Sequence, residues 1–314
     1  MVGSTPSGFR GLTEERIYSD AGAFAPGIRQ NLPVLMRLFR RRGERARHFF
    51  FAPNPRTAMA ARWAARVCRL PSVHTLCSLP AAGVPIGPGL FADQNVVVSP
   101  WAQRRLADEG FDSVVIEPAV LPLQSTEEGR ARCLERFGDY VLFAGDLRSG
   151  GGVQAVLETM THLPDGLSLV IACRTKTSAD RAHKDALEQQ LSVPGGRPVH
   201  VLGQIDWIGD LVSAAKAQFL PATDLTGKMD WPLVLLEGFA AGVPAVVAQS
   251  SPIAELDSPV LGHAPVDDPK ALAAALERVM GLDPAQSRDL YERRFTPKRL
   301  AEGYRQVYQR LGIG

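Results

Sequence analysis

The 314-residue sequence has little of what marks several classes of protein. Its four cysteines form no CxxC pair, which argues against a structural zinc site and in favour of a reducing compartment. No apolar run approaches the ~20 residues of a transmembrane helix, and the N-terminal MVGSTPSGFRG lacks a signal peptide's apolar core. The formal net charge of +2 creates no global basic field, so nucleic acid is not an expected partner. These absences predict a soluble cytoplasmic protein.

The sequence does contain a regular alternation of short apolar runs and helical patterns. Continuous apolar runs, many of them rich in β-branched residues and typical of strands buried on both faces, occur at 48–52, 72–76, 94–99, 113–117, 140–145, 167–173, 198–203, 217–222 and 244–249. Helical patterns are found between them at 56–69, 100–110, 152–163, 178–192, 207–216 and 232–241. This alternation indicates an α/β protein with parallel sheets.

The chain is longer than one hydrophobic core usually serves, so we expect two domains. Pro118 and Pro122 interrupt the alternation. Ser125, followed three residues later by Glu128, predicts a capping box that starts a new helix. We therefore place a domain boundary near residue 122.

Three loops in the second half follow predicted strands and carry polar or glycine-rich sequences. Residues 144–154, AGDLRSGGGVQ, contain glycines that would let backbone amides approach an anion. Arg174 and Lys176 come directly after a strand, where they are either exposed surface cations or a phosphate clamp. The third loop, 221–232, leads into an apolar helix that contains one carboxylate, Glu237. Burying a carboxylate without a partner costs free energy, so Glu237 is expected to face a partner group or a ligand.

The passage KMDWPLVLLEGFAAGVPAVVAQSSPIAE, residues 228–255, resembles the donor-binding segment of GT-B glycosyltransferases, and is most similar to the retaining family 4 enzymes. YVLFAGDL…GGGV, SLVIAC and VHVLGQI fall at that family's order and spacing, and NVVVSPWAQRRLADEGFDSVVIEPAV resembles a passage of its first domain. The resemblance implies two Rossmann-like domains facing across a cleft, with residues 1–122 on the acceptor side and 123–296 on the donor side. Residues 297–314 would form a helix that packs back toward the first domain, through a stripe of Leu300, Tyr304, Val307, Tyr308 and Leu311.

The same resemblance implies transfer of a sugar from a nucleotide-diphosphate sugar to an acceptor hydroxyl, with retention, with no metal site and no cofactor. Glu237 would accept hydrogen bonds from the donor ribose, and helix amides near Leu233 and Val234 would hold the diphosphate. The set of donor-binding residues expected in this way is Gly145, Arg148, Gly150, Gly151, Arg174, Lys176, Lys228, Met229, Leu233, Val234 and Glu237.

The sequence departs from the family pattern at the residues that usually contact the diphosphate. Met229 stands at the position of the first Glu of the family's E-x7-E pair. Asp146 stands at the position of the Arg in the family's GRL turn. Its Lys-Gly pair at the following helix start is replaced within Ser149, Gly150 and Gly151. Four other cations predicted near the crevice could substitute: Arg148, Arg174, Lys176 and Lys228. These replacements suggest a divergent subfamily.

No catalytic residue is identified from the sequence. His74 and Cys77 lie in the passage SVHTLCSLP, where family members often carry a His that faces the reaction centre, and a structural role for His74 is the alternative. The start of the chain resembles the family's second or third strand. We therefore expect the sequence to be truncated at its start and the first sheet to have an unfilled strand position.

The acceptor is left open, and a lipid-linked or cell-envelope glycan is one candidate. The basic segment RLFRRRGERARH, residues 37–48, is either a solvated helix end or a weak contact with an anionic membrane surface at the inner face. Two other functions are alternatives. A catalytically silent nucleotide-sugar-binding protein would fit Met229, whereas a nicotinamide-dependent dehydrogenase would need a GxGxxG fingerprint that the sequence lacks.

Overall fold

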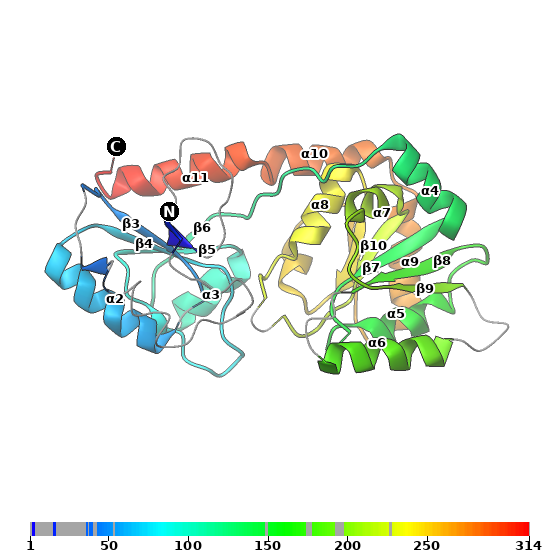
Figure 1. Cartoon of the computed structure of the whole chain (residues 1–314), viewed down its shortest axis with the longest axis horizontal. Coiled ribbons are helices and arrows are strands. Elements are labelled where there is room, and N and C mark those ends of the chain that lie inside the picture. The colour runs from blue at the N-terminus through cyan, green and yellow to red at the C-terminus, as the bar shows by residue number, and fades with distance from the viewer. Residues whose placement is uncertain are drawn as a thin grey trace.

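The computed structural model describes residues 2–3, 15–16, 36, 38–39, 43–52, 54–147, 150–173, 178–191, 198–225 and 228–313. Apart from a small pair of strands, β1 (Val2–Gly3) and β2 (Glu15–Arg16), these residues form two parallel sheets with associated helices. The two α/β units lie side by side along the long axis of the molecule (Figure 1). The two-sheet α/β architecture predicted from the alternating pattern is confirmed.

The first sheet has four strands that are adjacent in chain order. They are β3 (Arg47–Phe50), β4 (Ser72–Leu76), β5 (Gln94–Val97) and β6 (Val114–Val115). Helix α2 (Pro55–Cys68) connects β3 to β4, and α3 (Pro100–Asp108) connects β5 to β6. The unfilled strand position expected ahead of this sheet concerns residues that mostly lie outside the described part of the chain.

The second sheet has six strands whose spatial order reverses once. From one edge to the other they are β9 (Val199–Leu202), β8 (Ser168–Ala172), β7 (Tyr140–Ala144), β10 (Ala217–Leu220), β11 (Ala245–Ala248) and β12 (Leu261–Ala264). Numbered along the chain, this is the order 3-2-1-4-5-6 of doubly wound sheets. The reversal falls between β7 and β10, and ligands of such sheets bind at the carboxyl ends of the strands beside that point.

Helices cover both faces of the second sheet. They are α4 (Glu127–Phe137), α5 (Val153–Met160), α6 (Ser178–Leu191), α7 (Ile208–Ala214), α8 (Leu233–Ala241), α9 (Pro269–Met280) and α10 (Pro284–Arg294). Short 3-10 turns occur at Gly87–Gly89 and Pro252–Glu255. The sequence pattern did not predict β12, α9 or α10. The LGHA run of β12 is too short and too polar to predict a strand without its pairing to β11.

Helix α11 (Pro297–Arg310) leaves the second unit and lies along the first sheet (Figure 1). Tyr304 hydroxyl is 2.9 Å from Thr75 Oγ1, and Tyr308 hydroxyl is 2.6 Å from His48 Nδ1. The predicted apolar stripe of α11 packs against the first sheet and the residue that follows it. The stripe consists of Leu300, Tyr304, Val307, Tyr308 and Leu311, and its partners are Val73, Val96, Val114 and Ile116.

The helix that begins the second unit is capped by a different residue from the one predicted. Thr126 is the N-cap of α4, and its hydroxyl accepts a hydrogen bond from the amide of Gly129 at 2.9 Å. The capping box predicted from Ser125 and Glu128 is therefore wrong by one position. Asp210 on α7 also accepts from the amide of Thr126 at 2.7 Å, so this helix start is positioned by a tertiary contact as well.

Gly209 on α7 marks a close approach between that helix and the linker after the first unit. A Cβ added at Gly209 would lie 2.0 Å from the carbonyl oxygen of Gln124. We expect Gly209→Ala to lower the free energy of unfolding by about 3 kcal/mol, because the backbone of the linker must move. Urea denaturation measures this, with Gly281→Ala as the control, since a Cβ there makes only ordinary contacts. Equal stability of the two variants would contradict the prediction.

Candidate active site

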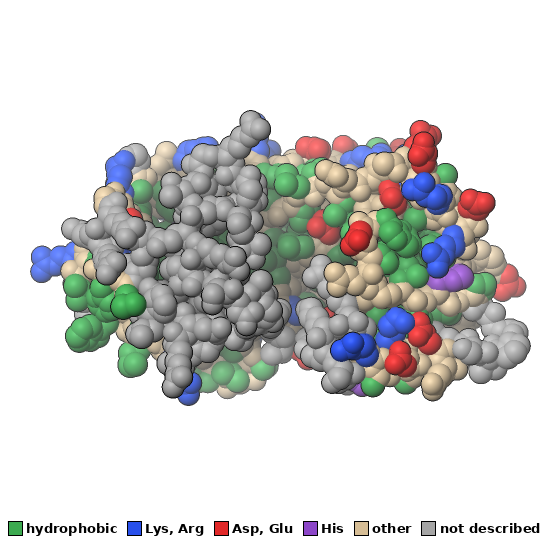
Figure 2. All heavy atoms as spheres, in the orientation of Figure 1, with side chains coloured by type: hydrophobic (Ala, Val, Ile, Leu, Met, Phe, Trp, Pro, Cys, Tyr) green, Lys and Arg blue, Asp and Glu red, His purple; other side chains and the backbone are tan. Residues whose placement is uncertain are grey.

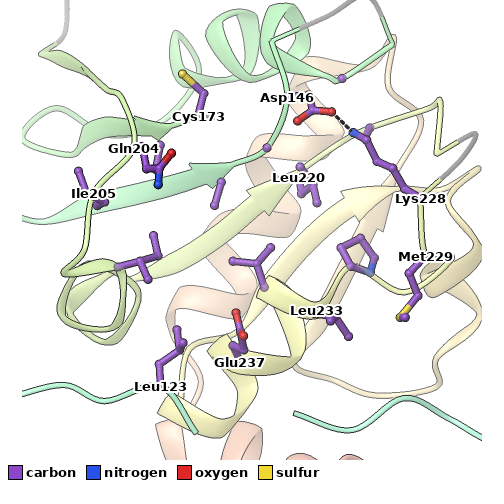
Figure 3. A pocket seen from close by; sticks show the side chains of 18 of the residues that line it. Leu123, Asp146, Cys173, Gln204, Ile205, Leu220, Lys228, Met229, Leu233 and Glu237 are labelled. Atoms are coloured by element: carbon purple, nitrogen blue, oxygen red, sulfur yellow. Dashed lines mark ion pairs between the residues drawn. The ribbon is translucent and has the colours of Figure 1, made fainter. Parts of the chain in front are cut away.

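A cavity of about 750 Å³ opens at the carboxyl ends of the second sheet's strands (Figure 3). Residues that follow β7, β8, β9 and β10 line it, together with Leu123 of the linker and the first turns of α8. The cavity therefore lies where the strand order reverses, and its volume is in the range that holds a small-molecule ligand.

Seven of the residues expected at the donor site line this cavity: Gly145, Gly151, Lys228, Met229, Leu233, Val234 and Glu237. Arg148, Arg174 and Lys176 lie outside the described residues. Gly150 is not among the lining residues. Its carbonyl accepts hydrogen bonds from the amides of Thr223 and Asp224, at 3.0 and 3.2 Å, and its φ of +75° favours glycine. Gly150 thus fastens the glycine-rich turn to the loop after β10.

Glu237 projects from α8 into the cavity (Figure 3). Helix α8 is apolar around its circumference because it packs against α7, α10 and the sheet, and Leu235, Leu236 and Phe239 are fully buried there. Glu237 itself is only partly buried. The single carboxylate of this apolar helix therefore faces the cavity and not the hydrophobic core.

The N-terminus of α8 is directed at the same space. Leu233 and Val234, the first two residues of the helix, line the cavity, and the N-cap residue Pro232 supplies no side-chain hydrogen bond. First-turn amides without side-chain partners carry the positive end of the helix dipole and favour an anion. Together with Glu237 one turn further on, they offer amide donors and a carboxylate acceptor to one ligand.

Asp146 and Lys228 form an ion pair at the cavity, with Lys228 Nζ 2.9 Å from Asp146 Oδ2 (Figure 3). Asp146 follows β7 and Lys228 belongs to the loop before α8. Their side chains are 29% and 31% exposed, so a ligand entering the cavity can reach both. An anionic ligand would compete with Asp146 for the Lys228 ammonium. Both positions stand out in the sequence, but their pairing was not predicted.

The loop after β9 and the start of α7 form another wall of the cavity, and these residues were not predicted as site residues. Its lining residues are Gly203, Gln204, Ile205, Asp206 and Ile208. Gln204 and Ile205 lie across the cavity from Lys228 and Met229 (Figure 3). The available signal was positional, because this polar G-Q-I-D run follows its strand just as Asp146 follows β7.

A buried hydrogen bond joins the loop at the cavity to the first unit. Ser99 Oγ, at the start of α3, donates to Asp230 Oδ2 at 2.6 Å and accepts from the amide of Ala102 at 3.0 Å. Ser99 and Asp230 are both buried. Burial raises the pKa of Asp230 to about 6, against the opposing effects of the Ser99 hydrogen bond and the nearby Arg105. Asp230 lies directly after the lining residue Met229, so this bond ties the cavity loop to α3.

Further contacts connect the two units beside this loop. Arg294 of α10 pairs with Glu117, and its Nε is 3.0 Å from Glu117 Oε2. The same guanidinium lies 5.7 Å from the ring centroid of the buried Trp231. Arg104 of α3 also pairs with Glu255. The orientation of the first unit is thus linked to residues next to the cavity.

The two weak catalytic candidates lie in the first unit and do not line the cavity. His74 is fully buried between Phe51 and Phe91, and its Nε2 is 3.1 Å from the carbonyl oxygen of Phe51. Burial lowers the pKa of His74 to about 4, so its ring is neutral at pH 7. Burial also raises the pKa of the Cys77 thiol, which keeps it protonated.

Within the described residues, no group of three or more His, Cys, Asp or Glu side chains is arranged to hold a metal ion. Over the same residues, no helix is both long and apolar enough to cross a bilayer.

Residues 138–281 match the model of the family described as Glycosyl transferases group 1. Three solved structures are similar to this chain over most of both chains. Anabaena HepE in complex with UDP is 15% identical with a TM-score of 0.72, covering 90% of this chain and 82% of that chain. Sucrose-phosphate synthase from Thermosynechococcus elongatus is 18% identical with a TM-score of 0.69, covering 95% and 83%. A UDP-forming trehalose-phosphate synthase from Burkholderia xenovorans in complex with glucose-6-phosphate is 14% identical with a TM-score of 0.62, covering 90% and 74%.

No curated protein sequence matches the chain. The solved structures are too distant in sequence to show more than the fold they share with this chain, which is that of two facing parallel-sheet domains.

Proposed function

We propose that this chain, which has the GT-B fold and matches the Glycosyl transferases group 1 family over residues 138–281, transfers a sugar from a nucleotide-diphosphate sugar to an acceptor hydroxyl. The observation that carries the proposal is the cavity at the strand-order reversal. There the uncapped start of α8 and the carboxylate of Glu237 face the same space. UDP is the first donor nucleotide to test, because similar structures were solved with UDP or UDP-glucose.

In the proposed complex each element of the cavity has one task. Amides of Leu233 and Val234 and the ammonium of Lys228 stabilise the diphosphate. Glu237 accepts hydrogen bonds from the ribose hydroxyls. The chain thereby positions the donor and stabilises the charge that develops on the leaving diphosphate, which are the main contributions a protein makes to such a transfer. Retention, a hexose as the transferred group and a lipid-linked or cell-envelope acceptor complete the proposal.

The Asp146–Lys228 pair provides a test that distinguishes a diphosphate site from an incidental cavity. We expect Lys228→Ala to weaken UDP binding about tenfold, because a charge-assisted contact is lost. Asp146→Asn should instead strengthen UDP binding roughly fivefold, because it removes a like charge and frees the Lys228 ammonium. Isothermal titration calorimetry with UDP, and with GDP and ADP in parallel, measures both changes.

The surface pair Lys216–Asp139 supplies the control, since its side chains are 3.2 Å apart and do not line the cavity. Asp139→Asn is expected to leave UDP affinity unchanged. Weaker binding in Asp146→Asn would show that Asp146 itself contacts the ligand. Unchanged binding in both cavity variants would show that the diphosphate does not bind beside Asp146 and Lys228.

A catalytically silent nucleotide-sugar-binding protein is the alternative function. The observation that favours it is Lys228, a predicted diphosphate cation that is already paired with a carboxylate. UDP-glucose binding without UDP release, with or without a panel of glycan acceptors, would support this alternative. Release of UDP that Lys228→Ala slows would support transfer.

A further inference from the structure

Three of the most exposed apolar side chains of the first unit lie on the outer side of α2. Met59, Trp63 and Val67 are 67%, 65% and 61% exposed and follow one another at four-residue intervals. Figure 2 shows hydrophobic side chains gathered at the end of the molecule where Figure 1 places α2. Side chains of this size are rarely left in water as a continuous stripe without a partner.

The inward side of α2 makes this arrangement more unusual. The helix contacts the rest of the unit through small buried residues, namely Ala58, Ala61, Ala64 and Cys68. At 3.6 residues per turn, the exposed stripe lies roughly 155° around the helix axis from this buried side. The helix therefore buries its small side chains and exposes its large ones, which is the reverse of an ordinary amphipathic helix.

The segment that precedes β3 extends the stripe. Met36 and Phe39 are 53% and 41% exposed, and the ring of Phe39 meets the ring of Trp63 edge-on at 6.4 Å. We define the α2 patch as Met36, Phe39, Met59, Trp63 and Val67. A basic run follows Phe39 directly in the sequence, as RRRGERAR from residue 40 to 47.

Charge identifies the kind of surface that the α2 patch fits. Residues 36–70 contain ten arginines and one glutamate, a net charge of +9, whereas the rest of the chain carries a net charge of −7. Helix α2 itself has no acidic residue in its sequence, PRTAMAARWAARVC. Large apolar side chains that include a tryptophan, together with a concentration of arginine, are the combination that binds at the interface of an anionic bilayer.

Two other occupants fit less well. A two-fold contact between copies would place one +9 segment against another, and like charges there would repel. Residues 1–35 contain three arginines and three acidic residues, so their net charge is zero and they offer no complementary charge. We propose that the α2 patch docks this protein on the surface of an anionic lipid bilayer.

Vesicle co-sedimentation tests the proposal on the full chain. Wild-type protein is expected to bind vesicles of phosphatidylcholine containing roughly one-third phosphatidylglycerol, to bind phosphatidylcholine alone at least about tenfold more weakly, and to dissociate at high salt. The double variant Met59→Ser/Trp63→Ser should lower the partition coefficient onto the anionic vesicles by about tenfold or more. Both positions are exposed, so thermal melting should show an intact fold.

Leu134→Ser is the matched control, because Leu134 is 41% exposed on α4 of the second unit and lies outside the patch. It should bind vesicles as the wild type does. The proposal is overturned if the double variant binds as tightly as the wild type, or if binding does not depend on anionic lipid. It is also overturned if the wild type fails to bind vesicles and instead self-associates in a way that the double variant abolishes. UDP affinity, measured on the same samples, reports separately on the proposed transfer function.

Discussion

Replacing Glu237 by alanine is expected to weaken UDP binding by about a hundredfold. The estimate follows from losing two charge-assisted hydrogen bonds to the ribose, each contributing ~1.5–3 kcal/mol, reduced because the residue is only partly buried. Glu237→Gln keeps the size and one acceptor oxygen, so its loss should be nearer tenfold. Calorimetric titration of UDP into the three proteins measures the series.

The stability of the ligand-free variants separates a ligand role from a structural one. If Glu237 serves the ligand, the free energy of unfolding should stay within about 1 kcal/mol of the wild type, because its side chain faces the cavity and is only partly buried. If it is a structural member of a buried ion pair, stability should instead fall by about 3–5 kcal/mol. Glu277→Ala, at an exposed position of α9, controls for the loss of a helical glutamate. A large loss of stability with unchanged UDP affinity would refute the ligand role.

Asp230→Ala is expected to slow UDP release from UDP-glucose by about tenfold while changing the dissociation constant for UDP less than about threefold. The reason is that the Ser99–Asp230 hydrogen bond holds α3 of the first unit against the cavity loop, so its loss disturbs the alignment of the two units more than the donor cavity itself. Steady-state rates and calorimetry on the same preparation measure the two quantities. An equal loss in rate and affinity would contradict this separation.

The same residue makes stability depend on pH in a defined direction. Burial raises the pKa of Asp230 from 3.8 to about 6, so between these values the folded protein binds a proton that the unfolded chain has released. The contribution of Asp230 to stability therefore declines as pH rises from about 4 to about 6 and is constant above that window. Asp230→Asn cannot titrate, and its stability relative to wild type should rise by about 3 kcal/mol across the window.

Urea denaturation at several pH values from 4 to 7 measures this difference between the two proteins. In Ser99→Ala the decline should extend to higher pH, because the hydroxyl that lowers the folded-state pKa of Asp230 is gone. Parallel stability profiles for wild type and Asp230→Asn would show that this carboxyl does not titrate in the window.

Local features of the sequence were sufficient to predict most elements. The run at 72–76 forms β4 over the same residues, and all five of its side chains are buried, as in a strand covered on both faces. Helix α8 begins and ends within one residue of its predicted bounds of 232 and 241. Pro232 precedes it, and Gly242 ends it with a φ of +90°.

Contacts between distant parts of the chain could not be predicted in this way. Ser99 and Asp230 are 131 positions apart, and their hydrogen bond exists only because the two units meet beside α8. The pairing of Asp146 with Lys228 likewise depends on the reversal of strand order, which brings the loop after β7 beside the loop after β10. The sequence placed both residues near one crevice, whereas the tertiary structure decided that the Asp146 carboxylate pairs with the Lys228 ammonium.

Helix α2 shows the same division between local and tertiary information. Its helical pattern was evident from residues 56–69, and its bounds differ from that range by one residue at each end. Hydrophobicity alone assigns Met59, Trp63 and Val67 to the interior. The helix lies close to the rest of the first unit through alanines, so only the tertiary structure decided that the large side chains face outward. Sequence by itself thus determined which segments become helices and strands, because those choices depend on near neighbours. The tertiary structure decided which side chains meet or remain exposed, because that depends on how the segments pack.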